Sequence, residues 1–322
     1  MPTNKLTVSH APFWHDGDSL FKMNLNILLA LLPATIFGII QFGAPALGVV
    51  ALSISTAMLW ELVMTLMAKK PLTVGDLDSA VIGMIFGVML PATAPWWLVV
   101  VGTFVAVVIG KMIFGGIGAN PFNPALIGMA FLMLSWKVMF DFDAAYIHYD
   151  FSFTALAPLA ALKSQGAAAI SDLFPTGKLI MGKQVGAIGS TFGLGLIVGG
   201  IYLILRGYIR WEISASFILG IIVTALCFNM AKPEVYGGPA IHLFSGYTLL
   251  GAFFLATENS SSPVNKIPMF LYGFFAGVMI ILMRNIGVYA DGTVLAILLL
   301  NLVNPLMDAI RPKALGKEVN HA

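Results

Sequence analysis

The chain has 322 residues, of which 59% are hydrophobic and only 10% are charged. A typical soluble domain carries about 25% charged residues, and more than half of its folded surface is already apolar. A soluble enzyme or a nucleic-acid-binding protein of this composition would have too little polar surface to cover its apolar side chains. The composition therefore predicts a lipid-embedded protein, and the net charge of +2 adds nothing about its partners.

About ten apolar stretches follow a polar N-terminal segment, so we expect an all-α integral membrane protein with about ten transmembrane helices. The N-terminal residues 1–22 are too polar for a cleaved secretory signal. Two stretches, Ala80–Leu90 and Tyr247–Ala256, are shorter than the ~20 helical residues that cross a hydrocarbon core. We expect these two to continue into irregular backbone, which membranes tolerate only where protein or a cavity surrounds it. The predicted segments are Met23–Gln41, Ala46–Met67, Ala80–Leu90, Trp96–Phe114, Pro124–Phe140, Ile188–Leu205, Ile213–Met230, Tyr247–Ala256, Ile267–Met283 and Gly292–Ala309.

Lysine and arginine residues concentrate on one side of these segments. The positive-inside rule then places both termini in the cytoplasm and the loop 141–187 outside. The chain divides into an N-terminal cytoplasmic segment with a first five-helix repeat (1–140), the outer loop (141–187), and a second five-helix repeat with a cytoplasmic tail (188–322).

The two halves share one layout: two long segments, a short broken one, a long one, and a last one entered through a polar or Gly-rich turn. Ser79 opens the short segment of the first half, and Ser245 precedes that of the second. Five spans per half invert the second half relative to the first, so we expect an inverted repeat. Paired broken helices of this kind point to a binding site near the bilayer midplane.

The strongest local motif is Gly115-Gly116-Ile117-Gly118-Ala119-Asn120-Pro121-Phe122-Asn123-Pro124-Ala125. Its glycines permit positive φ and close backbone approach, and Pro124 suits the first turn of a helix. Asn120 and Asn123 place two amides at this turn, and amides both donate to and accept from a neutral polar heterocycle such as a flavin ring. The alternative is that both asparagines only cap the helix.

Four charged residues, Glu61, Lys111, Arg284 and Asp291, lie close to predicted span ends. Intramembrane charges are costly and are by default paired or functional. We expect Lys111 to extend its ammonium to the interface, and Arg284 to pair with Asp291 or to face a polar cavity. His242 is expected to hydrogen-bond carbonyls of the second broken helix. The glycines between 193 and 200 are expected to allow close helix packing.

The sequence contains no pattern typical of hydrolysis, phosphate binding or metal binding. The single cysteine, Cys227, excludes a disulfide framework, a Cys-ligated iron–sulfur cluster and a Cys-rich zinc site within this chain. The acidic residues of the outer loop have neither EF-hand nor zinc spacing, so a solvated loop is expected there.

Together with several further blocks, the 115–125 motif resembles the RnfD/NqrB family. These proteins are membrane subunits of the Rnf complex and of the Na⁺-pumping NADH:quinone reductase, and the length here suits the D subunit of the Rnf complex. The resemblance covers nearly the whole chain, and the blocks that carry it are Ala94–Trp97, Lys111–Ala125, Ile241–Gly246, Leu250–Phe254 and Arg284–Leu306.

The resemblance implies a ten-helix inverted-repeat fold that is distantly related to urea transporters. It implies a riboflavin-type or FMN-type flavin bound non-covalently in the membrane core, near Gly116, Gly118, Asn120 and Asn123. It also implies an FMN joined through a phosphoester to a threonine of the outer loop. The resemblance further implies location in the bacterial inner membrane. It implies subunits of the A, B, C, E and G type as partners, and no binding to nucleic acid.

The sequence departs from the family at the covalent site, where the motif is roughly Asp-Gly-x-Ser-x-Ala-Thr-Pro-Leu. Aligned on Pro158-Leu159, the acceptor position holds Ala157, which has no hydroxyl. Thr154 is the nearest threonine, so either Thr154 accepts FMN in an altered frame or the covalent flavin is absent.

Two functions remain open at this point. The first is a flavin-carrying subunit of an Rnf-type complex that couples electron transfer between ferredoxin and NAD to Na⁺ or H⁺ translocation. The second is a urea-transporter-like solute channel without redox activity.

Overall fold

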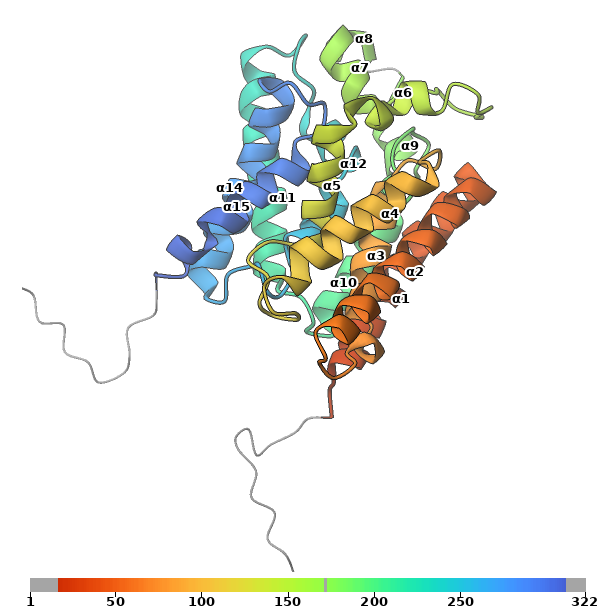
Figure 1. The fold of residues 1–322 in the computed structure, drawn as a ribbon. Coiled ribbons are helices and arrows are strands. Elements are labelled where there is room, and N and C mark those ends of the chain that lie inside the picture. The colour runs from red at the N-terminus through yellow and green to blue at the C-terminus, as the bar shows by residue number, and fades with distance from the viewer. Residues whose placement is uncertain (1–16, 171–172, 311–322) are drawn as a thin grey trace, which may run out of the picture.

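The computed structural model describes residues 17–170 and 173–310. All regular elements within these ranges are helices (Figure 1). The outer parts of the predicted N-terminal segment and C-terminal tail, residues 1–16 and 311–322, lie outside the described residues.

The first half contains a helix at each of the first five predicted segments. The third of these is short, as predicted, and the fourth continues without a break into a π-helical stretch. The elements are α1 (Leu20–Phe42), α2 (Ala44–Met67), η1 (Val74–Asp76), α3 (Asp78–Met89), α4 (Trp96–Phe104), η2 (Val105–Met112) and α5 (Pro124–Ser135).

The predicted outer loop folds into short helical pieces, and the second half again has a helix at each predicted segment. The connecting pieces are η3 (Lys137–Phe140), α6 (Phe142–Ala145), α7 (Pro158–Gln165), α8 (Ala167–Ile170) and α9 (Thr176–Ile180). The second half comprises α10 (Gly193–Leu205), α11 (Trp211–Ala231), α12 (Pro239–Phe244), α13 (Thr248–Leu250), η4 (Gly251–Leu255), α14 (Lys266–Asn285) and α15 (Thr293–Met307).

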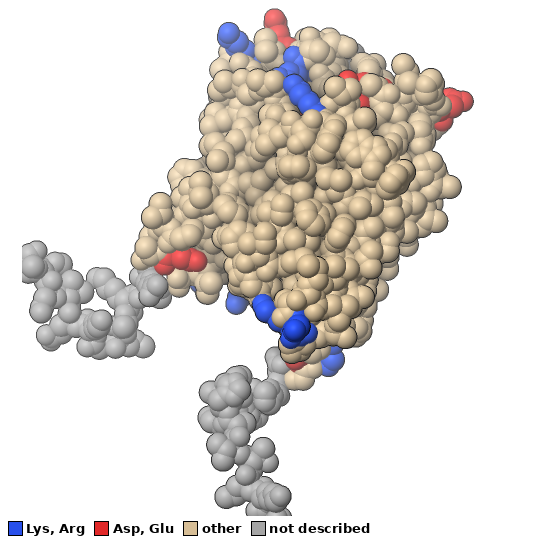
Figure 2. Space-filling model, viewed as in Figure 1, with Lys and Arg blue, Asp and Glu red and all other residues tan. Residues whose placement is uncertain are grey.

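Four of the helices in the described residues, α1, α2, α11 and α14, are long and apolar enough to cross a membrane. On the face seen in Figure 2, charged side chains gather at the two ends of the molecule and leave an uncharged band between them. This distribution suits a multi-pass protein whose middle band contacts lipid.

Local sequence explains the sharpest turns. Ser19 caps α1 by accepting a hydrogen bond from Lys22 N (3.3 Å). Gly43 joins α1 to α2 at φ +78°, a left-handed conformation that favours glycine. The fifth segment ends earlier than predicted because Trp136 leaves the helical conformation, with φ −132° and ψ 55°.

The short helix α3 forms the centre of the first half, and its residues from Ser79 to Met89 are all buried. A Cβ added at Gly83 would lie 2.7 Å from Ser53 O, so α2 and α3 pack with their backbones nearly in contact. The predicted close packing of the 193–200 glycines is confirmed, because a Cβ at Gly199 would overlap the carbonyl oxygen of Ala30.

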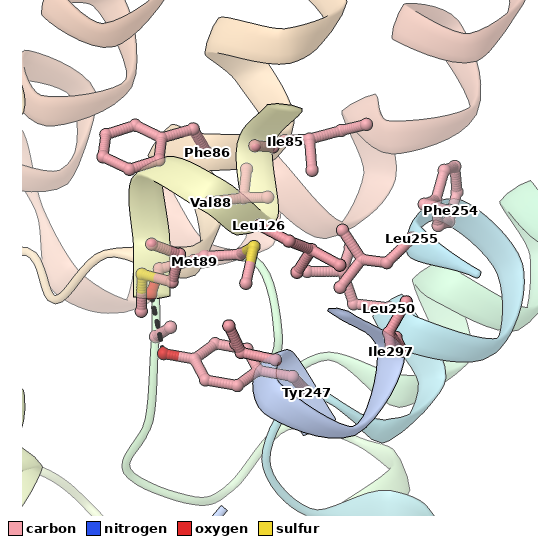
Figure 3. Packing of buried hydrophobic residues seen from close by; sticks show 14 of the residues in the cluster. Ile85, Phe86, Val88, Met89, Leu126, Tyr247, Leu250, Phe254, Leu255 and Ile297 are labelled. Carbon is pink, nitrogen blue, oxygen red and sulfur yellow. Dashed lines mark hydrogen bonds between the residues drawn. The ribbon is translucent and has the colours of Figure 1, made fainter. Parts of the chain in front are cut away.

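The broken helices α3 and η4 end inside the molecule, and each end is bonded to the other half of the chain. Tyr247 donates its hydroxyl to Met89 O (2.8 Å), as Figure 3 shows. Asn123 donates its amide Nδ2 to Leu255 O (3.0 Å). These bonds satisfy carbonyls that a helix end in a low-dielectric interior would otherwise leave unpaired.

Candidate functional site

The two predicted asparagines line a cavity of about 450 Å³ formed by both halves of the chain, which we call the amide cavity. Its walls come from α1, α3, the 117–125 turn, η4 and the turn that follows η4. Gly118, Asn120 and Asn123 are among the lining residues, whereas Gly116 is not. Gly116 at φ +108° and Gly118 at φ +80° instead give the turn before α5 a backbone conformation that favours glycine.

Asn123 has the capping role that the alternative interpretation predicts. Its Oδ1 accepts from Ala125 N (3.0 Å) and Leu126 N (3.4 Å) at the start of α5. Its Nδ2 is used by the bond to Leu255 O. Asn123 therefore fixes the cavity wall and has little hydrogen-bonding capacity left for a ligand.

Asn120 does not cap a helix, and its amide is only partly used. It is 5% exposed, and its Nδ2 donates to Phe122 O (3.0 Å) and to Glu258 Oε1 (3.3 Å). Among the described residues no donor bonds to its Oδ1. The Oδ1 atom is thus an acceptor at the cavity wall for a ligand N–H or O–H group.

Two carboxylates that sequence analysis did not assign to the site, Asp78 and Glu258, also line the amide cavity. Glu258 is held in place by Ser260 N (3.2 Å), Ser261 N (2.8 Å) and Asn120. Within the described lining there is no lysine or arginine. The cavity is therefore apolar with amide and carboxylate groups at its edge, which disfavours a ligand that brings a phosphate into it.

Asp78 connects the amide cavity to a buried charge cluster. Lys111 Nζ lies 2.9 Å from Glu61 Oε1, 2.8 Å from Asp78 Oδ2 and 3.2 Å from Ser79 Oγ. Lys111 and Glu61 side chains are both 1% exposed. The expectation that Lys111 extends to the interface is wrong, because carboxylates from α2 and α3 meet its ammonium inside the protein.

A second buried cluster surrounds Arg284, whose predicted pairing with Asp291 is confirmed at 2.9 Å. Arg284 also donates to His242 O (2.7 Å) and Thr248 Oγ1 (2.7 Å), at the break between α12 and α13. The prediction that His242 hydrogen-bonds carbonyls of the second broken helix is wrong. Its backbone carbonyl accepts from Arg284, while its ring nitrogens bond to no described residue.

A cavity of about 460 Å³ opens at the other end of the chain fold, against the pieces of the 141–187 loop, and we call it the loop cavity. Ala157, Lys137 and Tyr289 line it, with the Lys137 ammonium 5.5 Å from the Tyr289 ring centre. Asp143 Oδ1 accepts from Ala157 N (2.6 Å), and burial raises the pKa of this carboxyl above its ordinary value.

Comparison of the sequence with known proteins identifies the family of this chain. Residues 7–316 match the NQR2, RnfD, RnfE family. The chain belongs to this family. Among its relatives is the D subunit of the Na(+)-translocating ferredoxin:NAD(+) oxidoreductase complex of Acetobacterium woodii, 37% identical over 306 residues, with 94% of this chain and 92% of the relative covered.

Two further relatives show the same full-length similarity. The D subunit of the proton-translocating ferredoxin:NAD(+) oxidoreductase complex of Clostridium ljungdahlii is 34% identical, with 95% of this chain and 94% of the relative covered. The D subunit of the ion-translocating oxidoreductase complex of Yersinia enterocolitica is 32% identical, with 98% and 100% covered. The similarity thus extends over both cavities.

The family resemblance predicts an FMN ester, if one forms, at the loop position that Ala157 occupies. Ala157 lines the loop cavity but offers only a methyl group. Thr154 is partly buried and is not among the described lining residues. The Thr154 hydroxyl therefore belongs to a residue outside the described lining of the loop cavity.

Proposed function

We propose that this protein is the flavin-carrying membrane subunit of an Rnf-type complex that couples electron transfer between ferredoxin and NAD to Na⁺ or H⁺ translocation. Full-length similarity to relatives named as D subunits of such complexes supports this proposal. The observation that carries the flavin part is the amide cavity, with the free Oδ1 of buried Asn120 at its wall.

The amide cavity suits the unphosphorylated form of a flavin. A volume of about 450 Å³ lies within the range of pockets for small organic ligands. Asn120 Oδ1 would accept from the ring N–H of an isoalloxazine, while the apolar side chains of α3 and η4 exclude water. Glu258, whose described partners are neutral, and the absence of lysine and arginine from the described lining favour riboflavin over FMN. When bound, the flavin supplies the redox chemistry, and the protein holds and orients it.

We also propose that the two halves form a five-plus-five inverted repeat of the urea-transporter type. Lys111 and Arg284 stand in the last turn of the fourth segment of their halves. Each reaches the beginning of its own half's broken segment, at Ser79 and at Ser245 and Thr248. At the other ends of the broken segments, Met89 O and Leu255 O each accept a hydrogen bond from the opposite half.

The membrane setting follows from the same assignment. We propose location in a bacterial inner membrane with both termini cytoplasmic, which puts the loop cavity outside and the amide cavity on the cytoplasmic side of the broken helices. Partners would be the other subunits of the complex, of the A, B, C, E and G type, because the relatives are named as single subunits of larger assemblies.

Flavin analysis of the purified full chain tests the proposal. We expect riboflavin to be released on denaturation, with a yellow absorption band before it. Asn120→Leu removes the acceptor and should release most of the flavin during purification. Asn265→Leu, at the N-cap of α14 where its side chain makes no capping bond, is the matched control and should retain it.

A colourless protein from flavin-replete cells would contradict the proposal. If such a protein also conducted small neutral solutes in liposomes, the solute-channel function would replace the redox function.

A further inference from the structure

A third cavity, of about 60 Å³, adjoins the Arg284 cluster on the side of α7, and we call it the Arg284 cavity. Its polar lining includes Lys163 of α7, His242 of α12, and Arg284 and Asn285 in the last turn of α14. A volume of this size has room for a few waters or one small ion.

Several buried polar atoms of these residues have no partner in the described part of the chain. They are the two ring nitrogens of His242, Arg284 Nε and Asn285 Nδ2. His242 is 0% exposed and Arg284 is 3% exposed, so bulk water does not satisfy these atoms. Buried polar groups in native proteins are almost always hydrogen-bonded, so such a concentration around one cavity indicates a bound species.

Most of these four atoms are hydrogen-bond donors, which favours a bound species that accepts hydrogen bonds. Arg284 Nε and Asn285 Nδ2 are donors, and a neutral imidazole adds one more N–H donor. The other nitrogens of the guanidinium are already used, with Nη1 on His242 O and Nη2 on Asp291. The Nε–H group of Arg284 is thus the part of this cation that is left for the cavity.

The charge around the cavity also favours an anion over water. Lys163 and Arg284 line it, and its described lining contains no aspartate or glutamate. The Arg284 charge is balanced by Asp291, whereas Lys163 Nζ bonds to the backbone carbonyls of Gly287 and Tyr289. One positive charge without a described carboxylate partner therefore stands at the edge of the cavity, beside the donors.

The geometry points to a binding site for a single small anion of the chloride type, held by Arg284 Nε, Asn285 Nδ2 and a ring N–H of His242. Lys163 is exposed and stands at the edge of the cavity, where it would attract the ion from the solvent. The bound anion would balance the charge of Lys163 and complete the bonding at the end of α14. This site is separate from the amide cavity and does not depend on the flavin.

Thermal unfolding of the purified full chain in detergent tests the site, with chloride replaced by gluconate at constant ionic strength. We expect a melting temperature that rises with chloride and saturates, because a ligand bound to the folded state stabilises it. Lys163→Gln should raise the half-saturating chloride concentration about tenfold. Asn285→Asp, which places a negative charge in the cavity, should abolish the effect. The controls Lys178→Gln and Asn265→Asp change the same residue types elsewhere and should respond like the parent chain.

A melting temperature independent of the anion would overturn the proposal and leave water as the occupant. An anion effect that is unchanged in both Lys163→Gln and Asn285→Asp would place the ion elsewhere and would also overturn it. If Asn285→Asp does not fold, Lys163→Gln decides. Bromide soaked into crystals of the full chain gives an independent measurement, since its anomalous peak should lie between Arg284 Nε and Asn285 Nδ2.

Discussion

Removing the ammonium of Lys111 tests whether the charge cluster beside the amide cavity holds three helices together. In Lys111→Met the carboxylate of Glu61 stays 1% exposed and loses its counter-ion, retaining a bond from Thr73 Oγ1 (2.8 Å). Breaking a buried ion pair by removing one partner costs about 3–5 kcal/mol. Asp78 adds little to this loss, because it is 25% exposed and water can solvate it.

The companion variant separates lost charge balance from lost packing. In the double variant Glu61→Gln/Lys111→Met no uncompensated charge is left at Glu61, so the chain should recover about 2 kcal/mol relative to Lys111→Met alone. The measurement is the free energy of unfolding in mixed detergent micelles, followed by tryptophan fluorescence. Lys178→Met, at an exposed loop lysine, is the control for loss of a positive charge.

A loss below about 1 kcal/mol for Lys111→Met would refute this reasoning, because that is the range of an exposed pair. A loss in the double variant equal to the sum of the losses in Lys111→Met and Glu61→Gln would refute it as well, because residues that interact do not give additive losses.

Four further results are expected, at three positions of the chain. Asp143→Ala should cost about 1–3 kcal/mol in unfolding free energy, because it leaves Ala157 N–H without its acceptor, whereas Asp143→Asn keeps the acceptor and should cost much less. The raised pKa of Asp143 means that its protonated form favours the folded state. Its contribution to the unfolding free energy is therefore present below the ordinary pKa of 3.8 and is lost as pH rises through the folded-state pKa. Denaturation curves measured across this pH range should lose that pH dependence in Asp143→Asn. Gly83→Leu should prevent stable folding, because even a Cβ there would stand 2.7 Å from Ser53 O; the yield of detergent-stable protein measures this, and a normal yield would show that α2 and α3 can separate. In cells that carry the flavin transferase, mass spectrometry of the 150–163 peptide should detect FMN on Thr154 if the shifted frame operates, and an unmodified peptide would remove the covalent flavin from this chain.

The positions of the helices were predictable because each apolar stretch is delimited by polar, glycine or proline residues. The shortness of α3 and of the segment formed by α13 and η4 was also visible, since both runs are too short to span. The Asn-Pro pair at 123–124 predicted the start of α5, because Asn at the N-cap and Pro at the first turn are a local preference.

What the sequence could not provide is which distant residues meet. Glu258 contacts Asn120 from 138 positions away, and nothing local marks it as part of a cavity wall. Lys111 was assigned to the interface from its position near a span end, but Glu61, 50 residues earlier, holds it inside. Thr154 and Ala157 differ by three residues in sequence, yet the structure lines the loop cavity with Ala157 and not with Thr154.

The hydrogen bonds from Tyr247 to Met89 O and from Asn123 to Leu255 O have a consequence for biogenesis. When synthesis has reached about residue 140, the first half is complete but Met89 O still lacks its donor, Tyr247. The first half therefore cannot reach its final state in the bilayer until the second half has been made. We therefore expect two separately expressed fragments, divided within the 141–187 connection, to be degraded alone and to accumulate together.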